Sequence, residues 1–311
     1  MSERRLLNLP SYGILVGLAV SLGACDVAVD SGTSIYTARE EKRFAVTGRP
    51  DLTLSTFDGS IEIKAWDRPE VVVAVEKRAG DKALADAILI KVEQADNRIR
   101  VEVPKPSSTE SGTGFHVGGG SAFFGRMGSS ARLTVSVPRD CDVAARTADG
   151  SISIERVTGR LDLETGDGSV KGRDLGGTLK VHTEDGTLNF RDIKGKADLD
   201  TGDGGITITG VLEAVRAQTN DGAVTVRAEP GSTAAEAWDI RTSDGSVSID
   251  VPESLGADLD ARTSDGSVRV DGLSVTGSVE ADRQSLRGKI GAGGQTMRVR
   301  TGSGTITVRR Y

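Results

Sequence analysis

A repeat of eighteen residues dominates the second half of this 311-residue chain. Residues 147–152 read TADGSI, and residues 165–170 repeat the motif as TGDGSV. The aspartate of the motif recurs as Asp149, Asp167, Asp185, Asp203, Asp221, Asp244 and Asp265. The first five copies are 18 residues apart, spacings of 23 and 21 follow, and a last copy reads TGSGTI at 301–306. Self-similarity at a fixed period is typical of folds built from stacked, equivalent units.

Hydrophobic and polar residues alternate on both sides of each Asp-Gly turn. The positions four and two before the repeated Thr are apolar, as in Leu161 and Leu163, and an apolar residue such as Val170 follows the turn. Alternation with a period of two predicts two short strands in each repeat. The composition of 40 glycines, 8 prolines and 4% aromatic residues agrees with short strands joined by tight turns.

Two all-β architectures fit this pattern: a meander of hairpins that turn at Asp-Gly, and a solenoid whose coils lie on one another. Outward-facing charges favour the solenoid. Three residues before the Thr, the charge alternates in sign through Asp162, Lys180, Asp198 and Arg216, whereas Asp239 and Asp260 break the alternation in later copies. Alternating charges stabilise a fold only if residues eighteen apart are neighbours. We therefore predict a single-stranded β-helix, or β-solenoid, with coils of about 18 residues over 138–311.

Each member of the turn has a structural explanation. The Asp can accept a hydrogen bond from the backbone, the Gly can supply a positive φ angle, and the Thr hydroxyl can bind turn backbone groups. In stacked coils, four of the aspartates would also form a column of carboxylates, namely Asp167, Asp185, Asp203 and Asp221. Mutual repulsion in such a column would be relieved by calcium, so a cation site is one interpretation and simple Asx turns are the other.

The front half shows alternation without the strict period. We expect residues 40–137 to form an irregular β region that caps the solenoid, with a short helix near 82–87, and Arg309 and Arg310 to protect its other end. A Gly/Ser-rich loop over 104–131 holds Phe115, Phe123 and Phe124. These phenylalanines could contact a membrane or partner, or they could pack locally in a solvated insertion.

The N-terminus reads as an export signal. Residues 1–24 combine a basic start with a short apolar run, and the LGAC sequence ending at Cys25 resembles the lipobox of bacterial lipoproteins. Cys25 would then carry the lipid, residues 25–39 would be a tether, and the protein would be exported, anchored in a membrane and exposed to the periplasm or cell surface. The alternative is an ordinary signal peptide with an incidental cysteine. Cys141 would have no disulfide partner, and its alternation parity predicts a buried side chain.

Charge and residue inventory narrow the function classes. The net charge of −6 gives no basic footprint for nucleic acid. The two histidines, His116 and His182, do not form a ligand cluster with the cysteines, and no nucleophile motif with a base is present. We therefore expect no enzymatic activity and no cofactor other than the calcium considered above.

The repeated TSDGSV at 242–247 and 263–268, with GSIEI from Gly59, Trp66 and the later Val137-Pro138, resembles the bacterial putative-adhesin family of β-strand repeat proteins. The likeness covers 40–311 and extends to the β-helix-like head domains of putative autotransporter adhesins. It implies a non-catalytic adhesion or scaffold module that binds an envelope or extracellular polymer or protein. The alternative is a carbohydrate-active β-helix enzyme, a polysaccharide lyase or hydrolase, whose site would combine Asp with Arg or Lys from adjacent coils.

Overall fold

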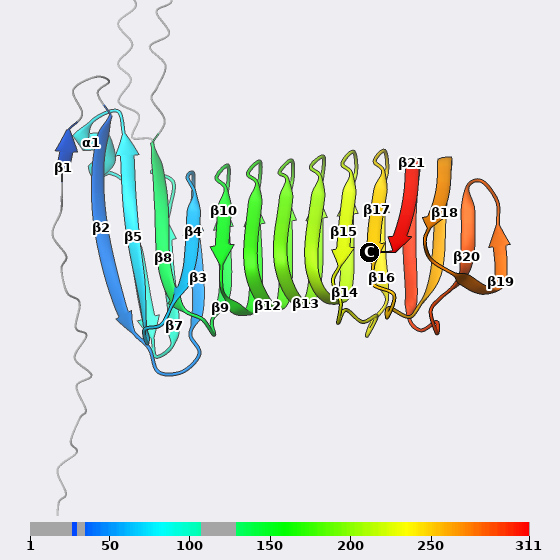
Figure 1. The fold of residues 1–311 in the computed structure, drawn as a ribbon. Coiled ribbons are helices and arrows are strands. Elements are labelled where there is room, and N and C mark those ends of the chain that lie inside the picture. Colours follow the sequence, from blue (N-terminus) through cyan, green and yellow to red (C-terminus); the bar gives the residue numbers. More distant parts are fainter. Residues whose placement is uncertain (1–26, 30–34, 107–128, 311) are drawn as a thin grey trace, which may run out of the picture.

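The computed structural model describes residues 27–29, 35–106 and 129–310, and these ranges form an elongated stack of strands with one short helix (Figure 1). The N-terminal elements are β1 (Val27–Val29), β2 (Tyr36–Ala45), β3 (Asp51–Thr56), β4 (Ile61–Trp66), β5 (Glu70–Ala79), α1 (Lys82–Asp86), β6 (Lys91–Ala95), β7 (Arg98–Val103) and β8 (Ser130–Pro138). The repeats form β9 (Asp142–Thr147), β10 (Ile152–Glu155), β11 (Thr158–Thr165), β12 (Val170–Thr183), β13 (Leu188–Thr201), β14 (Ile206–Thr219), β15 (Val224–Ala228), β16 (Trp238–Thr242), β17 (Val247–Val251), β18 (Ala257–Asp271), β19 (Val275–Ala281), β20 (Ser285–Ile290) and β21 (Thr296–Arg310). The all-β prediction is confirmed.

Parallel pairing joins residues eighteen positions apart through the regular repeats. Leu163 of β11 pairs with Val181 of β12, and Val181 pairs with Leu199 of β13. Val170 and Leu188 are partners in the same way on the other side of the Asp-Gly turn. The inward side chains form one apolar core that continues from Phe44 to Val308. The alternative of antiparallel hairpins within each copy is therefore wrong for these coils.

The buried threonines link one coil to the next. Thr165 donates to the Gly150 carbonyl at 2.7 Å, and Thr201 donates to the Gly186 carbonyl at 2.8 Å. Equivalent bonds join Thr147 to Gly59, Thr219 to Gly204, Thr242 to Gly222, Thr301 to Gly245 and Thr263 to Gly304. The predicted role of the hydroxyl is therefore confirmed. It donates to a buried carbonyl of the neighbouring coil, and at Thr183, Thr219 and Thr242 it also accepts from the amide of the Gly three residues later in its own turn.

Most of the turn glycines are needed for space and not for a positive φ angle. The predicted positive φ occurs at Gly59, with 124°, and at Gly304, with 152°, but Gly168, Gly186 and Gly204 do not have it, so the prediction is wrong for the regular coils. A Cβ atom at Gly186 would lie 1.9 Å from the Gly168 carbonyl oxygen of the preceding coil. Positive φ occurs at the opposite bend of the coil, for example at Asp174 with 53° and Gly177 with 97°. The Asp-Gly turns thus stack so closely that no side chain fits between them.

The last strand of the chain lies inside the stack. β21 pairs in parallel with β16 and β17 on one side and with β18 on the other, and Figure 1 places the C-terminus beside β17. The antiparallel strands β20 and β19 follow β18 and end the stack. The expectation that Arg309 and Arg310 protect an end is therefore wrong: they lie next to β17, where Arg309 pairs with Asp250 at 2.9 Å.

The position of β21 between β16 and β18 restores the charge alternation, which is interrupted when the copies are compared in sequence order. Arg298 of β21 is paired with Asp239 on one side and with Asp260 on the other, and Arg287 of β20 is the next partner of Asp260. The ladder therefore runs Asp162, Lys180, Asp198, Arg216, Asp239, Arg298, Asp260, Arg287 without a break. Each step places opposite charges on adjacent strands, which contributes about 0.2–1 kcal/mol.

The front region is more regular than predicted. β3 and β4 are in register with β9 and β10, and they lie between that coil and the one formed by β7 and β8. Beyond β8, the antiparallel strands β5 and β2 continue the sheet, and α1 begins after the N-cap Asp81, close to the predicted helix. Strand is already present at Val27–Val29 and from Tyr36 onward, within the segment expected to be a tether. The predicted Gly/Ser-rich loop lies between β7 and β8 in the sequence, and its residues 107–128 are outside the described residues.

Candidate functional site

A polar groove of about 850 Å³ runs along the stack where the outer sheet face meets the Asp-Gly turns. Residues of β12, β13, β14, β16, β21 and β18 line it in that spatial order. At about 4.8 Å between strands, the groove is about 24 Å long. Its floor is rigid because each of these strands has a backbone partner on both sides. A segment of an extended polymer fits such a site better than a single small molecule does.

One end of the groove is acidic. Glu184, Asp185, Asp200 and Asp203 line it there, together with His182. His182 Nδ1 lies 3.6 Å from Asp200 Oδ1, and both side chains are about half exposed, at 52% and 46%. The centre of the groove is uncharged, because it is lined by Gln218 and Thr219 of β14 and by Asn220, which follows β14.

The other end is basic. Arg241 of β16 and Arg300 of β21 line the groove there. They are direct partners in the parallel pairing of the two strands, and Arg262 of β18 is the partner of Arg300 on its other side. Arg241 binds both carboxylate oxygens of Asp239 at 2.7 Å. Arg300 donates from Nη2 to Asp260 Oδ2 at 2.7 Å and from Nη1 to the Asp260 carbonyl oxygen at 2.6 Å. These bonds hold the guanidinium groups in defined positions.

Asp260 is the centre of this charged cluster. Arg262 Nε and Arg287 Nε lie 3.4 Å and 3.3 Å from its Oδ1, in addition to the Arg300 bond. Partial burial alone would raise the pKa of Asp260, but the hydrogen bonds and charges of Arg300 and Arg287 outweigh it and hold the pKa below its usual value. Asp260 therefore stays ionised and fixes its arginines through electrostatic attraction.

The predicted aspartate column is present in part. Asp167, Asp185, Asp203 and Asp221 are all exposed, and Asp185 and Asp203 line the groove. Among residues 27–29, 35–106 and 129–310, no group of three or more His, Cys, Asp or Glu side chains is arranged to hold a metal ion. The calcium interpretation stays a hypothesis.

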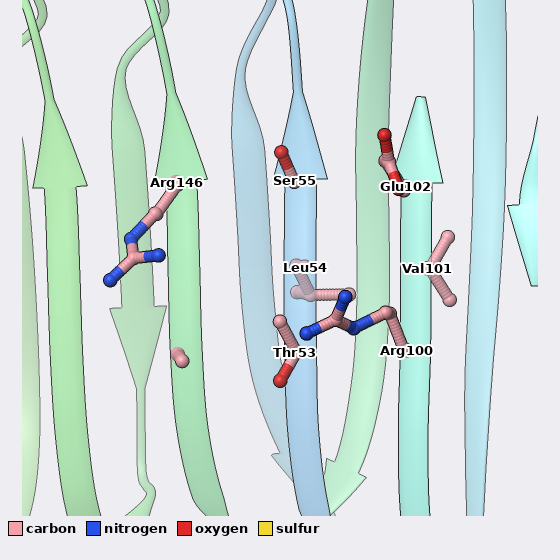
Figure 2. Close-up of a pocket in the computed structure, with 8 residues that line it drawn as sticks. Thr53, Leu54, Ser55, Arg100, Val101, Glu102 and Arg146 are labelled. Atoms are coloured by element: carbon pink, nitrogen blue, oxygen red, sulfur yellow. The ribbon is translucent and has the colours of Figure 1, made fainter. Parts of the chain in front are cut away.

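A second, smaller depression lies over β3 near the other end of the stack and has a volume of about 180 Å³ (Figure 2). It forms because the outward residues Thr53, Ser55 and Ala144 are small. Figure 2 shows Arg100 of β7 reaching across β3 above Thr53. Arg146 also lines the depression, but its Nε is bonded to Glu164 at 2.9 Å.

Of the remaining sequence predictions, the one for Cys141 falls on a described residue. Cys25 and the loop residues Phe115, Phe123 and Phe124 lie outside the described residues. Cys141 is fully buried, as predicted, and its thiol donates to the Asp142 carbonyl at 3.4 Å. Burial raises the pKa of the Cys141 thiol to about 12, and the Asp142 carboxylate adds to that rise. An un-ionised, buried thiol is a packing residue.

The sequence interpretation missed the groove arginines. Arg241 and Arg262 each precede the Thr of a TSDGSV copy, and Arg300 precedes the Thr of the last copy. The shared position was visible in the sequence, but their adjacency depends on the intercalated β21.

A protein-family model, Toastrack DUF4097, matches residues 50–309, which is most of the described structure. The chain belongs to the Toastrack DUF4097 family. No curated protein matches this Toastrack chain. Within its described residues, no helix has the length and apolar character needed to span a bilayer.

Several solved structures resemble this Toastrack chain at low sequence identity. A putative adhesin from Bacteroides fragilis is 14% identical, with 88% of this chain and 97% of that chain covered and a TM-score of 0.43. A putative adhesin from Parabacteroides distasonis is 13% identical, with 88% and 97% covered and a TM-score of 0.42. A putative lipid binding protein from the same organism is 12% identical, with 90% and 98% covered and a TM-score of 0.35. At these TM-scores the likenesses carry no argument about what this Toastrack chain binds.

Proposed function

We propose that this chain is an exported, membrane-anchored lipoprotein of the cell envelope that acts as a non-catalytic adhesion or scaffold module. Its partner is an envelope or extracellular polymer or protein that lies along the groove. The stacked coils, taken as a single-stranded β-helix, provide the rigid support. The observation that carries the proposal is the length of the groove together with its floor of paired strands. A floor of that kind loses little conformational freedom when a ligand binds.

The chemistry of the groove supports binding more than turnover. The cationic groups at its basic end are arginines, which stay protonated in proteins and therefore do not take up a proton from a ligand. Arg241 and Arg300 are also held by Asp239 and Asp260. Such fixed cations can hold an acidic ligand without taking a proton from it.

The binding proposal can be tested by blocking the centre of the groove. Gln218 points outward from β14 at that centre, so Gln218→Trp would fill it. Thr207→Trp is the matched control, because Thr207 points outward from the same strand on the other side of the coil. Co-sedimentation with isolated cell-envelope material should fall for Gln218→Trp only. Equal sedimentation of both variants and the unchanged protein would show that the groove is not the binding surface.

A carbohydrate-active enzyme is the second candidate, because the groove does bring Asp200 and Asp203 into one site with Arg241 and Arg300. The pairing of His182 with Asp200 could also support proton transfer. Incubation with envelope polysaccharides separates the two candidates. Release of shortened or unsaturated products that is lost in His182→Gln and Asp200→Asn would favour the enzyme, and binding without products favours the module.

The anchoring part of the proposal rests on the LGAC sequence at Cys25. Labelling of cells with an alkyne-tagged fatty acid should mark the unchanged protein and not Cys25→Ser. Label on both proteins, or on neither, would contradict lipidation at Cys25.

A further inference from the structure

The arginine cluster at the basic end of the groove, defined as Arg241, Arg262 and Arg300, has an unusual arrangement. Arg241 and Arg300 line the groove, and Arg262 lies beside Arg300 next to the groove. The three residues occupy successive positions of one ladder across β16, β21 and β18. Like charges directly opposite one another destabilise a sheet. In the neighbouring ladder the same strands alternate Asp239, Arg298 and Asp260. The cluster is therefore a departure from the charge alternation that the rest of this face follows.

The local charge is not balanced by the cluster's own partners. Arg241, Arg262, Arg300, Arg298 and Arg287 lie on β16, β18, β20 and β21. The acidic residues in register with them are Asp239, Asp260 and Glu280, and Asp282 also acts electrostatically on Arg262. Five cations against four anions leave an excess of one positive charge, on a chain whose net charge is −6. Such a field attracts anions to this end of the groove.

The arginines also have hydrogen-bond donors beyond those used internally. Each guanidinium carries five N–H donors. The bonds from Arg241 to Asp239 use Nε and Nη2, and the contact of Arg262 with Asp260 uses Nε. The remaining guanidinium donors suit carboxylate or phosphate oxygens, which arginine binds in a bidentate way.

We propose that the arginine cluster binds the acidic groups of an anionic glycan that lies along the groove. This inference rests on the proposed function and names the class of polymer. The acidic end repels such a ligand, so its charged groups lie over β16, β21 and β18. Gln218, Asn220 and Ser243 offer amide and hydroxyl groups to the sugar hydroxyls next to them.

Two observations favour a glycan over an acidic polypeptide. An extended polypeptide commonly binds by adding a strand to a sheet edge, whereas this groove lies over strands whose backbones are already paired on both sides. Hydrophobic pockets for side chains are also missing, because the described groove lining is polar apart from glycine. No Phe, Tyr or Trp side chain is part of that lining, so a neutral glycan would lack a stacking surface and the arginines must supply much of the affinity.

The test measures affinity of the full-length purified protein for three polymers: polygalacturonate, neutral dextran and poly-L-glutamate. The variants are Arg241→Gln, Arg262→Gln and their combination. Arg300 is left unchanged because it also donates to backbone carbonyls of Asp260 and Val299. Arg173→Gln is the matched control, since Arg173 is exposed on β12 on the other side of the coil.

We expect polygalacturonate to bind at least tenfold more tightly than dextran or poly-L-glutamate. Each cluster variant should weaken it about tenfold, and Arg173→Gln should change it less than twofold. Added salt should weaken the binding of the unchanged protein and have less effect on the double variant. Arg241→Lys should recover only part of the loss, because lysine keeps the charge but not the planar pair of donors.

Other outcomes overturn the inference in distinguishable ways. If polygalacturonate binds equally well to the cluster variants, the arginines are not the site, but a loss in Gln218→Trp would leave the groove function standing. If poly-L-glutamate binds as tightly as polygalacturonate, the glycan assignment is wrong. If polygalacturonate does not bind at all, the inference fails, and the envelope co-sedimentation assay decides the proposed function separately.

Discussion

Two adjacent glycines allow the close stacking of the Asp-Gly turns to be tested. Gly204 lies in the turn, and a Cβ atom there would be 1.9 Å from the Gly186 carbonyl oxygen and 2.9 Å from Thr201 Oγ1. At Gly205 the nearest atom to a new Cβ is the Ala223 carbonyl oxygen at 3.5 Å, an ordinary contact. Neither glycine has a positive φ angle. Gly204→Ala and Gly205→Ala therefore add the same methyl group to neighbouring residues with very different surroundings.

The expected cost of Gly204→Ala follows from these distances. An unstrained carbon–oxygen contact is about 3.3 Å, so two turns would have to separate by about 1.4 Å. That shift would break the bond from Thr201 to the Gly186 carbonyl, which is 2.8 Å long. A buried carbonyl left without a partner costs about 1–3 kcal/mol, and overpacking adds about 1–3 kcal/mol. The entropy advantage of Ala over Gly offsets about 0.4–1 kcal/mol, which leaves a net loss of about 1–6 kcal/mol.

Urea denaturation followed by circular dichroism measures both variants. Gly204→Ala should lower the free energy of unfolding by the amount above, and Gly205→Ala should leave it within about 1 kcal/mol of the unchanged protein. If the two variants have the same stability within about 0.5 kcal/mol, close contact between turns is not the reason for the repeated glycine.

Three further predictions concern the ladders. Thr201→Val should reduce the free energy of unfolding by about 1–3 kcal/mol and Thr201→Ser by clearly less, in the same denaturation assay, since only the serine keeps the hydroxyl. Arg298→Glu should cost about 0.8–4 kcal/mol at low salt and less at high salt, because it replaces two attractions, to Asp239 and Asp260, by two repulsions of similar size. An effect independent of salt would argue against charge pairing. The pKa of Asp260 is lowered in the folded state, so its contribution to stability is present above pH about 4 and is lost as the pH falls below that value. Denaturation curves measured from about pH 6 to about pH 3 should therefore show a smaller loss of stability at acid pH for Asp260→Asn than for the unchanged protein.

The regular coils could be predicted because their register is encoded locally. An 18-residue period places Leu163, Val181 and Leu199 at equivalent positions, and the structure pairs them directly. The helix at Lys82–Asp86 was visible in the same way, because Asp81 is a good N-cap and its side chain accepts from the Leu84 amide at 2.8 Å. In both cases the signal lies within a short stretch of sequence, namely one 18-residue repeat for the coils and the first residues of the helix for α1.

The order of the coils at the two ends could not be read from the repeat. Copies at 242–247 and 263–268 are identical in sequence, so either could follow β14, and any copy could lie between them. The one available signal was the charge conflict between Asp239 and Asp260, which requires a cation between them if alternation is to continue. Arg298 supplies it. Because the sequence interpretation treated Asp239 and Asp260 as exceptions to the alternation, it predicted neither the insertion of β21 nor the arginine cluster.

The candidate site therefore depends on long-range order more than on any motif. Without β21, Arg241 and Arg262 would come from separate coils, and Arg300 would be a residue near the chain end. Insertion of β21 brings the three together in one ladder and gives the last strand a partner on each side. The cost of stacking three cations is partly offset by the bonds to Asp239 and Asp260, and the charge that is left over is available to a ligand. β21 thus completes the alternating ladder of Asp239 and Asp260 and also creates the arginine ladder on which the proposed glycan site depends.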